Sequence, residues 1–273
     1  MRRYSVMHKN CEFSIIKLCR IKSMSGIEQE KLQHFGIYKP DTTILHPSKR
    51  SPESVPEARQ PEPRALLFDL GHVFLDASYN IIYQALGERG VVREKTKLIF
   101  TTDEYDDFAR GKIDERTLCD ALRTVVGLPD ITDEEIREIH DSHIFGLVPG
   151  MVELLEKVTQ KYGAGSIFFV TDACDWQIAR QQQLIDLSIY RVIASNKVGM
   201  LKSDPETVDN QGQRRSFFFS VLEELKLQPQ EVLLIDDSPE KIATADGYGI
   251  QTIQFTNKNQ LETDLKKRNI LGN

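Results

Sequence analysis

Carboxylates stand at the ends of apolar runs in this chain, a placement suited to binding a cation together with an anion. Asp236 and Asp237 close the run at residues 232–235, and Asp69 closes an earlier run at residues 65–68. Runs of this length are typical of buried strands, where a carboxylate is costly unless a positive group meets it. If the two strands are parallel neighbours, their acids converge at the carboxyl edge of one sheet, where open α/β proteins bind ligands. The pattern predicts a cation site that accepts a phosphate.

A third run changes from apolar to polar in the same way. Residues 166–170 are followed by Thr171 and Asp172, and Lys202 comes between this run and the acidic pair. In chain order the set Asp69, Thr171, Lys202, Asp236 and Asp237 resembles the motifs of the haloacid dehalogenase (HAD) superfamily. The resemblance extends from about residue 64 to residue 255. Each motif is weak by itself, and their order carries the match.

The resemblance implies a role for each acidic residue. Asp69 is the candidate nucleophile, because a carboxylate that attacks phosphorus gives an aspartyl-phosphate and divides one difficult displacement into two easier steps. An anion attacking a phosphate needs charge neutralisation, and Mg²⁺ prefers hard oxygen ligands. The implied ligands are Asp69, the backbone carbonyl of Gly71, Asp236 and, through water, Asp237.

The phosphoryl group is expected to be bound by a hydroxyl and an ammonium. Thr171 supplies the neutral donor and Lys202 the positive charge, which also relieves repulsion among the three carboxylates. Together with Asp69, these two residues form the expected catalytic set. The backbone N–H groups of Gly71 and Asp172 are further expected phosphate donors, and His72 is included among the candidate substrate-binding residues.

Gly71 departs from the usual pattern of the superfamily. Most of its phosphatases carry a second aspartate two residues after the nucleophile, which protonates the leaving group and then activates water. Loss of such a group typically lowers the rate by about 10²–10⁴. The sequence D-L-G-H-V at residues 69–73 resembles a sugar-phosphate phosphatase-like branch that also has glycine here. His72 is a candidate to supply the missing proton.

These residues favour a Mg²⁺-dependent phosphatase that hydrolyses small phosphorylated metabolites. One alternative is a haloacid dehalogenase-type hydrolase, which uses the same nucleophile on carbon without Mg²⁺; Thr171 and the pair Asp236 and Asp237 argue against it. The other is a catalytically weak binding or regulatory protein with the same fold. The cap, rather than the motifs, is expected to decide the substrate, and we expect Tyr105, Phe108 and Arg110 at that surface.

Alternating strands and helices predict an α/β fold with a Rossmann-like, mostly parallel sheet. Expected strands occupy residues 65–68, 166–171, 190–194, 232–236 and 250–255. Residues 77–147 have helical spacing and no strand character, which resembles the helical C1-type cap inserted after the first strand of the family's core. Thr132 and Glu135 form an expected capping box within it. The expected core is then residues 64–76 and 148–273.

The first 63 residues are expected to form a disordered extension. Residues 1–23 hold six Lys or Arg against the single acid Glu12, and six of the eleven prolines lie between residues 40 and 63. A basic start followed by a proline-rich linker offers little apolar surface to bury. Cytoplasmic localisation is the expectation, with organelle targeting by the basic segment as the alternative.

Composition limits the classes of partner. The chain has 273 residues, 40% hydrophobic content and a formal net charge of −6. These values favour a soluble protein of one or two domains, and the charge argues against a nucleic-acid partner. No apolar run approaches the ~18 residues of a membrane span, so a membrane partner is not expected. The sequence leaves the oligomeric state open.

Cysteine and histidine spacing does not indicate zinc. Cys11, Cys19, Cys119 and Cys174 form no C-x-x-C pair and are expected to be free thiols. His140 and His143 are one helical turn apart without an evident third ligand. We expect them to be surface histidines at the end of a helix.

Overall fold

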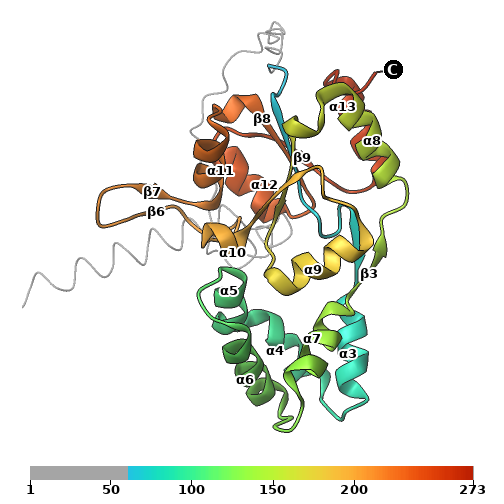
Figure 1. Ribbon diagram of the computed structural model, residues 1–273, viewed down its shortest axis with the longest axis vertical. Coiled ribbons are helices and arrows are strands. Elements are labelled where there is room, and N and C mark those ends of the chain that lie inside the picture. Colours follow the sequence, from blue (N-terminus) through green and yellow to red (C-terminus); the bar gives the residue numbers. More distant parts are fainter. Residues whose placement is uncertain (1–60, 273) are drawn as a thin grey trace, which may run out of the picture. The chain divides into compact units, whose positions relative to one another are not determined.

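The structure is a computed structural model that describes residues 61–272 (Figure 1). The expected disordered extension, residues 1–63, lies outside the described residues except for its last three. Two of these contact the folded part: the carbonyl of Pro61 accepts a hydrogen bond from Gln251 Nε2 at 2.9 Å, and Glu62 Oε1 accepts one from the Tyr162 hydroxyl at 2.9 Å.

A five-stranded parallel sheet forms the centre of the described residues. Its spatial order is β5-β4-β1-β8-β9, so β1 lies between two strands that follow it much later in the chain. The strands coincide with the expected apolar runs, and the predicted sheet is confirmed. Their bounds are β1 (Ala65–Phe68), β4 (Ile167–Thr171), β5 (Arg191–Ala194), β8 (Val232–Asp236) and β9 (Gln251–Gln254).

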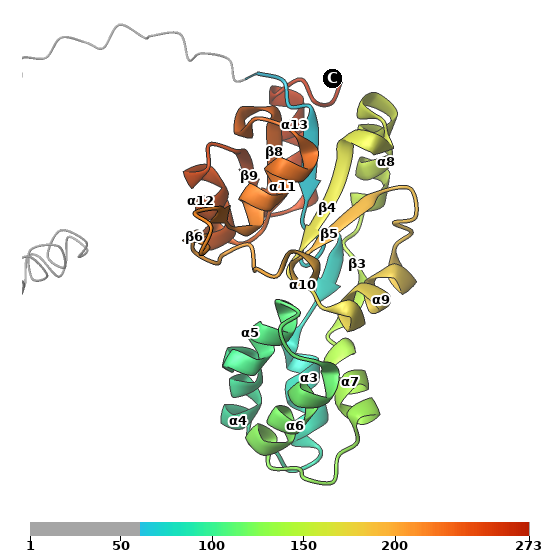
Figure 2. The same ribbon diagram turned by 60° about the vertical axis from the view of Figure 1, so that its left-hand side comes forward.

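Helices cover both faces of this sheet (Figures 1 and 2). Along β1, Leu66 and Phe68 point to one apolar cluster, whereas Ala65 and Leu67 point to another, because side chains alternate along a strand. Both faces of the strand are therefore buried. The first cluster includes α8 (Met151–Tyr162) and α13 (Lys258–Lys267), and the second includes α11 (Phe217–Leu225) and α12 (Pro239–Gly247).

An insert between β1 and β4 is mainly helical and has an apolar cluster of its own. The capping box of Thr132 and Glu135 is confirmed at the start of α7. Trp176, from the helix that follows β4, is part of the insert's cluster, so the insert packs on the core. The helices are α3 (Tyr79–Gly87), α4 (Arg93–Leu98), η1 (Ile99–Thr101), α5 (Asp103–Ala109), α6 (Glu115–Val126) and α7 (Asp133–Asp141).

The insert also contains a strand, contrary to the expectation of an all-helical segment. Strand β3 (Ile144–Leu147) pairs antiparallel with β2 (Leu75–Ala77), with Leu75 opposite Leu147. The two strands are about 70 residues apart in the chain, and four residues carry little strand signal alone. Pairing between the two ends of the insert, which local sequence does not encode, creates this ribbon.

The remaining elements complete the core. The polar loop at residues 206–215, whose structure we did not predict, is a short antiparallel ribbon. Among the described residues, no helix has the length and apolar character needed to cross a membrane. The elements are α9 (Asp175–Leu184), α10 (Ser195–Val198), β6 (Thr207–Val208), β7 (Arg214–Arg215), η2 (Ala164–Ser166) and η3 (Pro229–Glu231).

The expectation for the two histidines is wrong. His140 and His143 lie at the end of α7, as expected, but both side chains are buried. The ring of His140 packs 5.9 Å from that of Trp176, and the two imidazole centroids are 5.1 Å apart. Packing of α7 against α9 covers a helix end that the sequence alone suggested was solvated. Cys119 and Cys174 are buried free thiols.

Candidate active site

The predicted acids meet at the carboxyl ends of β1 and β8. Phe68 pairs with Ile235, and the N–H of Asp69 donates to the carbonyl of Ile235 at 2.9 Å, so Asp69 and Asp236 stand side by side. Asp69, Asp236 and Asp237 each place one carboxylate oxygen within 4.8 Å of the others. The register of two parallel strands thus gathers three acids that lie far apart in the chain.

Lys202 supplies the positive charge that this cluster requires. Its side chain is fully buried, and its Nζ donates to Asp69 Oδ1 at 2.8 Å and to Asp236 Oδ2 at 2.7 Å. Burial alone would lower the pKa of Lys202, but the attraction of Asp69 and Asp236 raises it, so the ammonium stays charged. The backbone N–H of Lys202 donates to Asp172 Oδ1 at 2.8 Å, which fixes the loop that carries it.

Asp69 is held by one oxygen only. Lys202 engages Oδ1, whereas Oδ2 makes no hydrogen bond to any described residue. Burial raises the pKa of Asp69 to about 6, against the opposing effect of Lys202. At neutral pH the carboxylate is therefore still largely ionised. An anchored carboxylate with one uncommitted oxygen suits a nucleophile.

A cavity of about 220 Å³ opens beside Asp69. The predicted substrate-binding residues line it, except Lys202, which lies behind Asp69. Asp236 is likewise not part of the lining. The cavity is lined by Asp69, Gly71, His72, Leu75, Ala77, Tyr79, His143, Ile144, Thr171, Asp172, Gln177, Gln181, Asp237, Ser238 and Lys241.

In the turn after Asp69, the residue with a positive φ is His72 and not the glycine. Gly71 does not have a positive φ, and a Cβ placed on it would meet nothing within 4 Å. The residue in the left-handed region is His72, with φ of 55°, and its N–H donates to the carbonyl of Leu75 at 2.9 Å. The side chain of His72 is exposed at the cavity. Neither steric conflict nor backbone conformation therefore requires glycine at position 71.

Lys241 is a cavity residue that the sequence analysis missed. It lies in the first turn of α12, where the Ser238 hydroxyl caps the helix and Pro239 follows. Its Nζ is 3.0 Å from Asp172 Oδ2. Burial alone would lower the pKa of Lys241, but Asp69 and Asp172 raise it. A capping Ser and a Pro directly after the acidic pair are a signal that would have placed this lysine at the strand ends.

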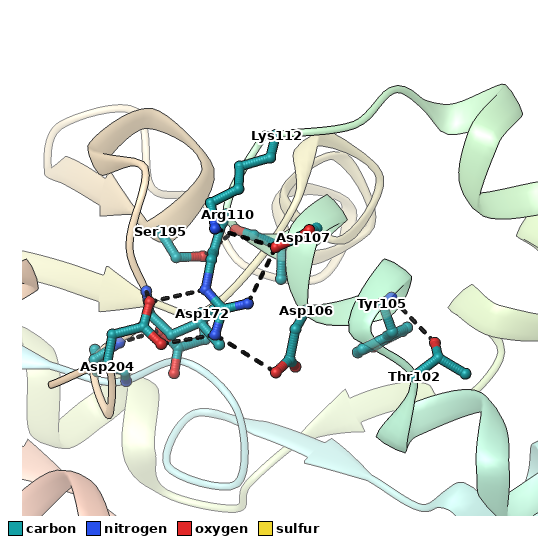
Figure 3. Close-up of polar contacts among 12 residues, drawn as sticks. Thr102, Tyr105, Asp106, Asp107, Arg110, Lys112, Asp172, Ser195 and Asp204 are labelled. Atoms are coloured by element: carbon teal, nitrogen blue, oxygen red, sulfur yellow. Dashed lines mark hydrogen bonds and ion pairs between the residues drawn. The ribbon is translucent and has the colours of Figure 1, made fainter.

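One arginine links the helical insert to the loop that carries Lys202 (Figure 3). Arg110, at the end of α5, donates from Nε to Asp204 Oδ2 at 2.8 Å and from Nη2 to Asp204 Oδ1 at 2.7 Å. The same Asp204 accepts the N–H of Leu201 at 2.8 Å. Burial would raise the pKa of Asp204, but the bonds from Arg110 and Leu201 hold it below its ordinary value.

The insert residues expected at the substrate surface have other roles. Arg110 forms the link just described, the Tyr105 hydroxyl pairs with His140 Nε2 at 3.1 Å, and the Phe108 ring packs 5.0 Å from Trp176. None of the three lines the cavity. From the insert, Tyr79, His143 and Ile144 line it instead, because α3 and β3 are the parts of the insert next to the strand ends.

The acidic cluster fits a hard divalent cation. Three carboxylates within 4.8 Å provide oxygen donors, the ligand type that Mg²⁺ prefers. Lys202 neutralises part of their charge and leaves the cluster net negative. Asp236 Oδ1 accepts the N–H of Ser238 at 2.9 Å, which orients that carboxylate. Asp69 and Asp237 line the cavity, so a bound cation would face a substrate there.

Comparison with solved structures identifies the fold. A HAD family enzyme, bt-2542 from Bacteroides thetaiotaomicron in complex with magnesium and inorganic phosphate, matches 71% of this chain and 95% of its own with a TM-score of 0.59 and 21% identity. A HAD-like family hydrolase from Porphyromonas gingivalis matches 76% and 98%, with a TM-score of 0.59 and 16% identity. The HAD-hydrolase YfnB from Bacillus subtilis, bound to magnesium, matches 77% and 100%, with a TM-score of 0.53 and 16% identity.

These likenesses show the fold, and the predicted architecture is confirmed: an α/β, Rossmann-like core with a five-stranded parallel sheet and a mainly helical insert. No family model matches the sequence, and no curated protein does. The activity must therefore be argued from the cavity and its residues.

Proposed function

We propose that this protein is a Mg²⁺-dependent phosphatase that hydrolyses small phosphorylated molecules through an aspartyl-phosphate on Asp69. The observation that carries the proposal is the state of Asp69. Asp69 is buried, and Lys202 donates a hydrogen bond to its Oδ1. Its Oδ2 has no hydrogen-bond partner among the described residues, and Asp69 lines the cavity together with Asp237. The solved structures with magnesium, one of them also with inorganic phosphate, support the same chemistry by analogy of fold.

The reaction follows from the groups around the cavity. Asp69 Oδ2 attacks phosphorus, the bond from phosphorus to the leaving oxygen breaks, and that oxygen takes up a proton. Water then attacks the phosphorus of the aspartyl-phosphate, which releases inorganic phosphate and restores Asp69. Thr171 and Lys241, which line the cavity, bind phosphoryl oxygens as charge develops on them, and Lys202 holds Asp69 in place instead of reaching the phosphate as the sequence suggested. A Mg²⁺ ion would be held by Asp69, the Gly71 carbonyl, Asp236 and, through water, Asp237. When bound, it would neutralise charge on the phosphoryl group.

Lys241 adds a second cation to this proposed machinery. It lines the cavity and is held by Asp172, which also fixes the loop of Lys202. Asp172 thereby holds the ammonium of Lys241 at the cavity and the backbone of the loop that carries Lys202. We expect Asp172 to act mainly through its carboxylate, in addition to the backbone N–H that the sequence suggested.

The absence of a carboxylate at position 71 supports two alternative functions, a dehalogenase-type hydrolase and a binding protein. A dehalogenase-type hydrolase uses the same nucleophile and needs no second acid. A binding protein with this fold would have lost turnover for lack of that acid. The first would release halide without Mg²⁺, and the second would bind phosphate without releasing it from an ester.

The test is phosphate release by the full chain from p-nitrophenyl phosphate, with Mg²⁺ and with EDTA. Activity should require Mg²⁺, and Asp69→Asn should abolish it, because the amide is nearly isosteric but too weak a nucleophile. Asp246→Asn is a matched control at an exposed aspartate remote from the cavity lining. Full activity of folded Asp69→Asn, or in EDTA, would contradict the proposal.

A further inference from the structure

Asp172 and Lys241 form an ion pair on the wall of the cavity. Asp172 directly follows β4, Lys241 lies in the first turn of α12, and both residues line the cavity. Lys241 Nζ is 3.0 Å from Asp172 Oδ2, and the two side chains are only 22% and 16% exposed. Because little water screens these charges, each of them acts strongly on an anion in the cavity.

Both members of the pair are also fixed by bonds to the backbone. Asp172 Oδ1 accepts the N–H of Lys202 at 2.8 Å, and the N–H of Lys241 donates to the Ser238 hydroxyl at 3.5 Å. A phosphate that displaced Asp172 from Lys241 would have to break the bond to Lys202 as well. Asp172 therefore stays beside Lys241 when phosphate binds, and its negative charge remains in the cavity.

This pair sets the charge that the wall offers to phosphate. Among the described residues that line the cavity, Lys241 is the only lysine or arginine, and Asp172 opposes its charge. The other lining acids, Asp69 and Asp237, belong to the proposed Mg²⁺ site, where the cation would offset them. Phosphate thus meets an ammonium whose attraction is largely cancelled by its own partner.

We propose that Asp172 limits the affinity of the cavity for phosphate by cancelling the charge of Lys241, so that inorganic phosphate leaves readily after each turnover. Asp172 is a positioning residue in this account, because it acts through Lys241 and not on the reacting atoms. The proposal rests on the proposed phosphatase function. It goes beyond that function by assigning one acid of the lining to product release.

Binding of inorganic phosphate to the full chain at saturating Mg²⁺, measured by titration calorimetry, tests the proposal. Asp172→Asn removes the charge but keeps the shape and an oxygen that can accept the N–H of Lys202. We expect its Kd for phosphate to be about tenfold lower than that of wild type, because one negative charge close to the anion is lost. An unchanged or higher Kd would overturn the proposal.

A charge-compensating variant separates this effect from a structural role. Lys241→Met should raise the Kd for phosphate about tenfold, whereas Asp172→Asn combined with Lys241→Met should return it close to the wild-type value, because the net charge of the pair is again zero. A double variant that binds phosphate as weakly as Lys241→Met would show that Asp172 only holds Lys241 in place, and the proposal would be wrong.

Asp175→Asn is the matched control. Asp175 forms a comparable pair with Lys197 at 3.0 Å, but both side chains are exposed and neither lines the cavity. Its Kd for phosphate should equal that of wild type. A fall as large as that in Asp172→Asn would assign the effect to the net charge of the molecule and contradict the proposal.

Kinetics give a second measurement of the same effect. Inhibition of p-nitrophenyl phosphate hydrolysis by inorganic phosphate should strengthen about tenfold in Asp172→Asn, and kcat should not rise. Asp172→Ser, a smaller neutral replacement, should change the inhibition in the same direction. Unchanged inhibition in both variants would overturn the proposal.

Failure of this inference is distinguishable from failure of the proposed function. Absence of phosphate release from p-nitrophenyl phosphate by wild type removes the phosphatase and the role in product release together. Release by wild type, combined with equal phosphate affinity in wild type and Asp172→Asn, removes only the role of Asp172.

Discussion

Gly71 is the residue where the proposed chemistry is least complete. The leaving oxygen needs a proton, and no carboxylate occupies this position to supply one. The structure has room for an aspartate side chain at position 71, since a Cβ there meets nothing within 4 Å and the φ of Gly71 is not positive. An aspartate at this position would enter the lining of the cavity beside Asp69.

Gly71→Asp should therefore raise turnover of an alkyl phosphate by about tenfold or more, because general acid catalysis typically contributes about 10²–10⁴. p-Nitrophenyl phosphate, whose leaving group hardly needs a proton, should gain much less. Turnover of both esters by wild type, Gly71→Asp and His72→Ala under the same Mg²⁺ measures the effect. Rapid wild-type turnover of the alkyl ester that is unchanged in His72→Ala would show that proton supply does not limit this site.

His143 gives a prediction for stability against pH. Its pKa is lowered from 6.5 to about 4 in the folded protein, so the unfolded chain binds a proton more readily between these values. The contribution of neutral His143 is fully present above pH 6.5 and is lost as pH falls toward 4. The difference corresponds to about 3 kcal/mol.

Denaturant unfolding between pH 4 and 7 measures this effect. His143→Gln should weaken the loss of stability on acidification, because the amide does not titrate. His72→Gln removes a neighbouring imidazole whose charge also lowers the pKa of His143, so it should reduce the acid loss of stability less than His143→Gln does. Identical pH profiles for His143→Gln and wild type would show that His143 does not contribute to acid destabilisation.

At the scale of elements, contact between the helical insert and the core includes polar bonds besides the apolar packing on Trp176. Arg110 binds Asp204 with two parallel bonds, and the hydroxyl of Ser195 donates to the carbonyl of Ala109 at 2.6 Å (Figure 3). Gly111 packs so closely on α10 that a Cβ there would lie 2.4 Å from the carbonyl oxygen of Asn196, and its φ of 69° also favours glycine. The insert thus contacts the loop that leads to Lys202.

Arg110→Lys should lower kcat for p-nitrophenyl phosphate by about tenfold, because lysine cannot reproduce the paired bonds that hold Asp204 and, through Leu201, the loop of Lys202. Arg110 is a positioning residue in this account, so kcat should change more than KM. Arg116→Lys, the same change at an exposed position of α6, is the control. A wild-type kcat in Arg110→Lys would show that the contact between the insert and the core does not position Lys202.

At the scale of the whole molecule, the described part of the chain begins with contacts to the core. Besides the bonds of Pro61 and Glu62, Arg64 pairs with Glu231 at 2.8 Å, and Pro63 is buried. A chain that starts at Pro61 keeps all of these contacts. One that starts at Arg64, the boundary favoured by composition, loses the bonds of Pro61 and Glu62 and the buried Pro63.

We expect a chain beginning at Pro61 to fold and to retain the phosphatase activity of the full chain, because the core and the insert each bury an apolar cluster made of residues beyond that point. A chain beginning at Arg64 should have a slightly lower melting temperature, since two hydrogen bonds of about 1 kcal/mol each are lost. Thermal unfolding and phosphate release from p-nitrophenyl phosphate compare the two. Insolubility of the chain that begins at Pro61 would show that residues 1–60 are needed for folding.

The sequence by itself determined the sheet and the gathering of acids at one edge of it. Apolar runs of four or five residues that end in Asp69, Thr171 and Asp236 are typical of strands in a parallel sheet covered on both faces, and parallel strands bring like ends together. Local patterns were also sufficient for the capping box at Thr132. These features depend on residue type and spacing along one element, which a sequence contains directly.

Only the tertiary structure decided which side chains share the cavity with those acids. Gln181 and His143 have no local signal, since a glutamine in a polar helix and a histidine at a helix end are ordinarily solvated. Their burial depends on the packing of α7 and α9 and on the pairing of β2 with β3, which joins residues about 70 positions apart. The proposed nucleophile is thus encoded at the end of a strand, whereas these other lining residues of its cavity come together only when distant elements pack.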